Sequence, residues 1–269
     1  MKSIIAIDYN PGAMGSFLLW NLFKKIPSLD HYSTSDIRTW GYNNHHARPD
    51  FKIYNHDQVL TNNILETLAD NKYNYYTIAS HNMLSLLPKE IQQLTTTLRI
   101  QTDYETLPVV IFFFWYKAGD FMIDYVSKNN TNCVEGMFRQ LIRCVDETHI
   151  DTSDNCKYNI AFKDLQHYDQ VQYLLEQATN KLDVKQAPVD KIWYSCEYTR
   201  SMQPLSLYPD NFSRLAEVVF WIYAQLTITK DYNSIVAQAN SSTWNTFSMF
   251  LEEFVKTLNI INTSKGRLI

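Results

Sequence analysis

The sequence predicts a single α/β domain with a central parallel sheet flanked by helices. Short apolar runs rich in β-branched residues recur along the chain, and stretches with helical periodicity lie between them. The chain has 269 residues, which is enough to bury a full hydrophobic core. Alternating strands and helices indicate parallel strands with both faces of the sheet covered. Ligands of such folds bind at the carboxyl ends of the strands.

The expected strands are short, mostly apolar runs. Ser3–Tyr9 is almost continuously apolar, as a buried parallel strand is. Val109–Trp115 shows no alternation of apolar and polar residues, so we assign it to the centre of the sheet. Two further strands are expected at Tyr75–Ser80 and Tyr158–Phe162.

The expected helices follow from apolar residues spaced three or four apart. The first helix, Phe17–Lys25, ends at two lysines and Pro27. A polar, aromatic segment at 30–57 is expected to be a lid or insertion, and 210–260 a helical C-terminal part of the domain 1–269. Further helices are expected at Asp57–Ala69, after Pro88, and at Asp120–Ser127, Glu135–Val145, Asp169–Ala178, Asn211–Thr227 and Thr243–Leu258.

Composition disfavours several classes of protein. There are 24 Lys and Arg against 28 Asp and Glu, a net charge of −4 without a basic stripe, so nucleic-acid binding is not expected. The 4 cysteines lack metal or disulfide-framework spacing, which favours reduced thiols in a cytoplasm. No secretory segment is visible, and the longest apolar run is too short to span a bilayer. The histidines at 31, 45, 46 and 56 show no metal-binding pattern, so we expect no metal.

The most informative segment is Asn10–Ser16, which holds two of the chain's 6 glycines between a predicted strand and a predicted helix. A helix N-terminus offers unpaired N–H groups and partial positive charge, and glycine lets an anion approach the backbone. The segment therefore suggests a phosphate-binding loop. It lacks the Gly-Lys-Ser/Thr ending of the Walker pattern. A ligand-free connection using glycine and a Ser cap is an equal alternative.

Four pieces of the chain, in order, resemble the sulfotransferase family. Its phosphate loop is similar to Pro11–Phe17, and its strand ending in Lys-Thr-His before Leu-Pro resembles Ala79–Pro88. A family strand running into Arg-Asn/Asp-Pro/Ala-x-Asp resembles Phe113–Asp120, and a strand followed by Tyr-Glu-Asp-Leu resembles Ile160–Leu165. The resemblance implies a P-loop NTPase-like fold of the sulfotransferase type.

The resemblance also implies an activity, which is sulfuryl transfer from 3′-phosphoadenosine 5′-phosphosulfate to a small-molecule or glycan hydroxyl acceptor. His81 would be the catalytic base, and a histidine suits that role because its pKa lies near neutrality. Lys117, Ser127 and Arg139 would neighbour the 3′-phosphate. The acceptor would lie under the segments 40–56 and 193–200. The donor loop would consist of Gly12, Ala13, Met14, Gly15, Ser16 and Phe17.

Two alternatives stay open. The family's loop lysine has no counterpart among Gly12, Ala13 and Met14, and its 3′-phosphate arginine and serine align with Tyr116 and Asp124. These departures favour a catalytically impaired relative that binds a nucleotide or a partner protein. Another P-loop transferase or kinase is the third alternative, although its Gly-Lys-Ser/Thr signature is absent.

Overall fold

The computed structural model describes residues 3–10, 12–27, 75–80, 89–116, 133–148, 158–207 and 209–264. The chain divides into two compact units, which we describe one at a time. The first comprises Met1–Gln101 and Thr152–Ser201, and the second Thr102–Asp151 and Met202–Ile269. The single domain stays a prediction. The expected lid at 30–57 and the helices at 57–69 and 120–127 lie outside the described residues.

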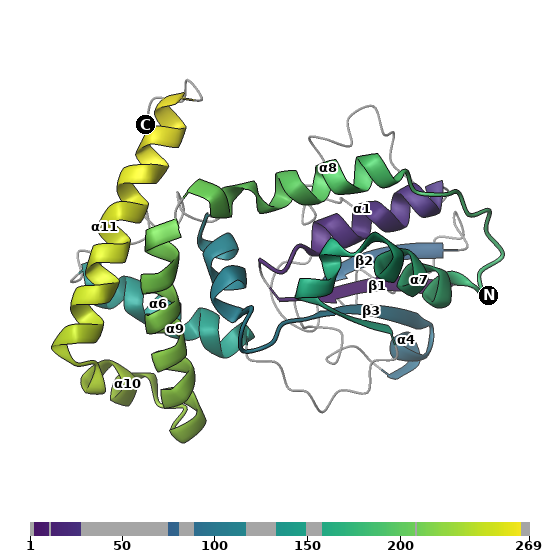
Figure 1. The fold of residues 1–269 in the computed structure, drawn as a ribbon. Coiled ribbons are helices and arrows are strands. Elements are labelled where there is room, and N and C mark those ends of the chain that lie inside the picture. The colour runs from purple at the N-terminus through teal and green to yellow at the C-terminus, as the bar shows by residue number, and fades with distance from the viewer. Residues whose placement is uncertain are drawn as a thin grey trace. The chain divides into compact units, whose positions relative to one another are not determined.

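The first unit contains a four-stranded parallel sheet (Figure 1). Its strands in chain order are β1 (Ser3–Tyr9), β2 (Tyr75–Ser80), β3 (Thr95–Gln101) and β4 (Tyr158–Ala161). Their spatial order is β2-β1-β3-β4. The predicted α/β class is confirmed, and so are the strands that begin at Ser3, Tyr75 and Tyr158.

The strand order creates a switch point at the carboxyl ends of β1 and β3. In chain order the described sheet goes from β1 to β2 on one side, and from β3 to β4 on the other. The connections that follow β1 and β3 therefore lead in opposite directions. In open parallel sheets, this divergence leaves the crevice in which ligands bind.

Helices α1 (Gly15–Lys25) and α7 (Tyr168–Thr179) contact each other and cover one face of this sheet (Figure 1). Tyr9, Ile100 and Ile160 are register partners and point to this face. Both helices agree with the predictions. The other helices that the structure describes in this unit are α4 (Lys89–Gln93), the 3-10 helix Phe162–Gln166 and α8 (Lys191–Met202).

The opposite face of the sheet holds an ion pair. Asp8 precedes Tyr9, so its side chain points away from α1, and its register partner on β3 is Arg99. One carboxylate oxygen, Asp8 Oδ2, accepts from Arg99 Nε at 2.9 Å and lies 2.8 Å from Arg99 Nη2. The Asp8 side chain is fully buried and that of Arg99 is 11% exposed. The pair therefore joins β1 to β3 in a water-poor environment. Removing either partner would leave the other charge buried and unpaired, which destabilises the folded state.

The second unit is helical in its described residues. Aromatic rings form its core: Phe138 lies 4.8 Å from Trp244 and 5.5 Å from Phe247, and Trp115 lies 6.0 Å from Phe250 between ring centroids. The predicted helices at 135–145, 211–227 and 243–258 are confirmed. The helices described in this unit are residues 107–116, α6 (Cys133–Thr148), the 3-10 helix Gln203–Leu207, α9 (Pro209–Ile228), α10 (Tyr232–Gln238) and α11 (Ser241–Ser264).

The predicted central strand at Val109–Trp115 is wrong, because residues 107–116 are helical. Asp103 and Thr106 start this helix. The Thr106 N–H donates to Asp103 Oδ1 at 2.9 Å, and the Asp103 N–H donates to Thr106 Oγ1 at 3.0 Å. This reciprocal pair is a capping box, which satisfies backbone donors that the first turn leaves unpaired. The strand of this region is β3, Thr95–Gln101, which the sequence did not predict.

Removing Arg99 should destabilise the first unit strongly. Arg99→Met would leave the Asp8 carboxylate buried without its counter-ion, and we expect a loss of about 3–5 kcal/mol in the free energy of unfolding. Urea denaturation followed by circular dichroism measures this loss. Arg99→Met combined with Asp8→Asn should recover most of it, because no buried charge remains.

The matched control is Lys191→Met, which breaks the exposed pair between Lys191 on α8 and Asp169 on α7. We expect this change to cost at most about 1 kcal/mol. If the two single variants lose the same free energy of unfolding, burial of the Asp8–Arg99 pair would not make its loss more costly than that of an exposed pair.

Candidate functional site

The loop between β1 and α1 turns sharply through left-handed backbone. Gly12 has φ 91°, which glycine adopts without strain. Met14 has φ 60° and ψ 28°, and it is the residue that caps α1. A left-handed conformation costs a non-glycine residue about 1–2 kcal/mol. The turn is closed by the Ala13 N–H, which donates to the Asn10 carbonyl at 2.9 Å. The loop thus starts α1 directly at the carboxyl end of β1.

The N-terminus of α1 has neither of the side-chain groups that usually stabilise the start of a helix, a capping hydrogen bond and a first-turn carboxylate. Met14 makes no side-chain capping hydrogen bond, and the first turn contains no acidic residue. The expected alternative of a Ser cap is wrong, since Ser16 is the second residue of the helix. The positive end of the helix dipole is therefore not balanced by a carboxylate of its own first turn. Such an end can bind an anion through backbone N–H groups.

Tyr9 fixes the position of Gly15. A Cβ atom added to Gly15 would overlap the Tyr9 ring, so only glycine fits at the first position of α1. Burial raises the pKa of the Tyr9 hydroxyl, a side-chain hydrogen bond with Ser16 opposes that rise, and the nearby Asp8 charge adds to it. Tyr9 thus contacts two successive residues at the start of the helix. Gly15 is required by packing inside the protein, whether or not an anion binds.

Only part of the loop is accessible. Ala13, Met14, Ser16 and Phe17 are buried, with exposed fractions of at most 6%. Gly12 is partly exposed. Among the six residues predicted to form the donor loop, Gly12 is therefore the one that solvent reaches. A ligand, or a side chain introduced by mutation, can contact the loop there.

Aromatic residues of α8 lie against the last residue of the loop. The Phe17 ring packs edge-on against Tyr194 at 5.1 Å and against Tyr198 at 5.9 Å between centroids. Tyr194 also contacts Tyr168 at 5.2 Å. Burial raises the pKa of both the Tyr194 and the Tyr198 hydroxyl, which keeps them neutral. The segment predicted to face the acceptor thus contacts Phe17 of the predicted donor loop.

The Asp8–Arg99 pair is the charged feature of this region that sequence reasoning missed. Both residues lie next to the carboxyl ends of their strands, beside the switch point. Asp8 is the one charged residue in Ser3–Tyr9, and Arg99 is the one charged residue in Thr95–Gln101. A single charged residue of opposite sign in each of two otherwise uncharged strands was the sequence signal that could have predicted this ion pair. Arg99 brings a cation to this edge of the sheet, but Asp8 balances its charge.

The other predicted site residues are not part of the first unit as described. His81, Lys117 and Ser127 lie outside the described residues. Arg139 is on α6 in the second unit, where Nε and Nη2 donate to Glu135 Oε1 at 3.0 and 2.8 Å and Nη1 donates to Asn233 Oδ1 at 2.8 Å. Its role at a 3′-phosphate stays a prediction. Because 107–116 is helical, Lys117 follows a helix and not the expected strand.

Comparison with known proteins adds no relative. No protein-family model matches the chain, and neither a curated protein nor a solved structure matches it. Within the described ranges, the helices are too short or too polar to cross a membrane.

The Tyr9–Gly15 contact predicts a coupled effect on stability. Gly15→Ala should lower the free energy of unfolding by about 1–3 kcal/mol, because the added methyl group overlaps a buried ring. In a Tyr9→Ala background the ring is gone, and the same change should cost less than about 0.5 kcal/mol. A double-mutant cycle by chemical denaturation measures the coupling.

The same substitution inside α6, Gly136→Ala, serves as the control. It should stabilise the protein by up to about 1 kcal/mol, because alanine is the better helix former. Equal costs of Gly15→Ala in the two backgrounds would refute the contact as the reason for glycine.

Proposed function

We propose that this chain binds the phosphate groups of a nucleotide at residues 12–17 and transfers a sulfuryl group to a hydroxyl acceptor. The donor would be 3′-phosphoadenosine 5′-phosphosulfate, and the fold would be the P-loop-like type of the sulfotransferases. The observation that carries the proposal is the start of α1. Its N-terminus has neither a side-chain cap nor a first-turn carboxylate, and it lies beside the switch point of a parallel sheet.

The order of elements supports the proposal at three of the four resembling pieces. The loop follows β1, and His81 follows the last residue of β2 directly. The fourth piece, Ile160–Leu165, runs from the end of β4 into the 3-10 helix that precedes α7. The third piece was misplaced. The resemblance placed Lys117–Asp120 directly after the third strand of the sheet. In the structure, the segment directly after β3 is the turn Thr102–Thr106.

In the proposed reaction, the protein would position the reactants and stabilise charge. The S–O bond to the donor phosphate breaks as the acceptor oxygen bonds to sulfur, and the acceptor proton passes to His81. Backbone N–H groups at the start of α1 and its dipole would stabilise the negative charge that develops on the leaving phosphate. Lys117, Ser127 and Arg139 are the proposed neighbours of the 3′-phosphate.

A second candidate function is nucleotide binding without transfer. Two observations favour it. No lysine occurs in residues 12–17, and the arginine at this edge of the sheet, Arg99, has its charge balanced by buried Asp8. A missing charge-assisted hydrogen bond weakens phosphate binding by about 1.5–3 kcal/mol. Both candidates place the nucleotide at the same loop, so binding and transfer are tested separately.

Binding at the loop is tested by a pair of substitutions at Gly12. The wild type should bind adenosine 3′,5′-bisphosphate with a Kd below about 1 mM, measured by isothermal titration calorimetry. Gly12→Asp should weaken binding at least about tenfold, because it adds a carboxylate where the phosphate would lie. Gly12→Asn has the same shape without the charge and should bind much more tightly than Gly12→Asp.

Asp and Asn tolerate left-handed backbone better than most residues, so the two variants should lose similar stability. Thermal denaturation checks that they do. No binding heat from the wild type at millimolar ligand, or equal binding by Gly12→Asp and Gly12→Asn, would overturn the assignment of the loop.

Transfer is tested at His81. If the chain is a sulfotransferase, His81→Ala should lower the rate of sulfuryl transfer by about 10²–10⁴-fold while leaving binding of adenosine 3′,5′-bisphosphate unchanged. The assay follows release of the bisphosphate from the sulfuryl donor with phenolic, alcoholic and sugar acceptors. The control is His167→Ala, which changes an exposed histidine outside the proposed site and should leave the transfer rate unchanged. A wild type that binds the bisphosphate but transfers to none of the acceptors would favour the second candidate.

A further inference from the structure

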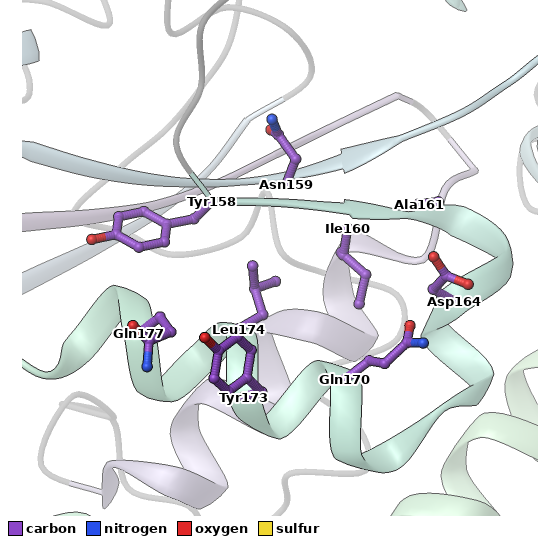
Figure 2. Close-up of a pocket in the computed structure, with 9 residues that line it drawn as sticks. All are labelled: Tyr158, Asn159, Ile160, Ala161, Asp164, Gln170, Tyr173, Leu174 and Gln177. Carbon is purple, nitrogen blue, oxygen red and sulfur yellow. The ribbon is translucent and has the colours of Figure 1, made fainter.

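A pocket of about 440 Å³ lies between β4 and α7, on the first unit (Figure 2). Its volume falls within the range of small-molecule sites. Ile160 from the strand and Leu174 from the helix point toward each other and form its apolar floor. Both are buried, with exposed fractions of 6% and 9%. The pocket is thus built on the packed junction of a strand and a helix, a rigid support.

The Asn159 side chain points away from α7, and the other polar side chains divide between the two ends of the pocket. Figure 2 shows Tyr158, Tyr173 and Gln177 at one end, and Asp164 and Gln170 at the other. Tyr173 is 65% exposed, an unusual position for a large ring on a helix that otherwise buries its apolar residues. The pocket therefore offers an aromatic surface beside amide and carboxylate groups.

The charge of the lining restricts the ligand. None of the nine residues that line the pocket is Lys, Arg or His, and Asp164 contributes a carboxylate. Phosphate, sulfate and carboxylate ligands are therefore disfavoured. Asp164 lies at the end away from Tyr158 and Tyr173, so the rings and the carboxylate do not enclose one cation. A neutral ligand fits this distribution.

The groups are spread along the helix. Gln170 and Gln177 lie seven residues apart on one stripe of α7, which is about 10 Å of helix. Amides both donate and accept hydrogen bonds, and a carboxylate accepts them. A ligand with hydroxyl groups along its length could bond both ends while an apolar ring face rests on Tyr173.

We propose that this pocket binds a neutral, hydroxyl-rich ligand of the size of a short oligosaccharide. The aromatic face of Tyr173 would contact the C–H groups of a sugar ring, and Gln170, Gln177 and Asp164 would bind its hydroxyl groups. This site uses none of residues 12–17 or His81. It holds whether the chain transfers a sulfuryl group, binds a nucleotide only, or does neither.

Saturation-transfer NMR with four neutral disaccharides tests the proposal: maltose, cellobiose, lactose and N,N′-diacetylchitobiose. At about 10 mM sugar, which detects Kd values in the millimolar range, the full chain should give a signal with at least one of them. Tyr173→Ala should weaken that binding about tenfold by removing the aromatic contact. Gln177→Ala should also weaken it. Both positions are on the surface side of α7, so folding is checked by circular dichroism alone.

Two matched variants control for nonspecific effects. Ile192→Ala removes another strongly exposed apolar side chain, and Glu176→Ala changes the neighbour of Gln177 that does not line the pocket. Both should bind the sugar as the wild type does. Gly12→Asp should also leave sugar binding intact, which separates this test from that of the loop.

The proposal is overturned if no disaccharide gives a signal with the wild type. It is equally overturned if Tyr173→Ala and Ile192→Ala bind alike. An adenosine signal that Tyr173→Ala removes and Gly12→Asp keeps, without a signal from any sugar, would assign the pocket to a nucleobase instead and would also reject the proposal.

Discussion

The contact between the Tyr9 ring and Gly15 determines how the first unit presents its loop. Tyr9 is the last residue of β1 and Gly15 the first of α1, so their contact brings the helix start against the strand end. The four residues that the structure describes between them must then turn within a short space. Gly12 and Met14 accomplish this with left-handed backbone. The strain at Met14 is offset by the packing of α1 on the sheet.

The strand order of the parallel sheet places this loop where ligands of such folds bind. Had β1 been an edge strand, the loop would lie at the margin of the fold. Because β1 lies between β2 and β3, the loop and the positive end of α1 lie beside the switch point, where ligands of open parallel sheets bind. The same sheet holds the charged pair on its opposite face and the pocket at its β4 side. One strand order therefore positions three distinct features.

Local patterns predicted the parts of the fold that local physics determines. β1, β2 and β4 are apolar or β-branched runs bounded by polar residues, and α1 and α7 carry clear apolar stripes. The run 109–115 misled because an apolar segment without periodicity suits a buried strand or a buried helix, and a capping box six residues earlier decides between them. β3 was missed because its β-branched residues are mostly threonines, so TTTLRIQ lacks the apolar run that marked the other strands. The glycine loop was found because its position between strand and helix is local, whereas the pocket arises only when β4 meets α7.

The ion pair between β1 and β3 also matters before the protein is folded. Its partners are 91 residues apart, so during synthesis β1 leaves the ribosome long before Arg99 exists. For that time Ser3–Tyr9 is an exposed, β-prone apolar segment, the kind that assembles with other copies of itself. Asp8 is its only charge, and a lone charge in such a segment acts as a gatekeeper against aggregation. The carboxylate that pairs with Arg99 in the native sheet is therefore also the charge that would oppose self-association of this segment before Arg99 is synthesised.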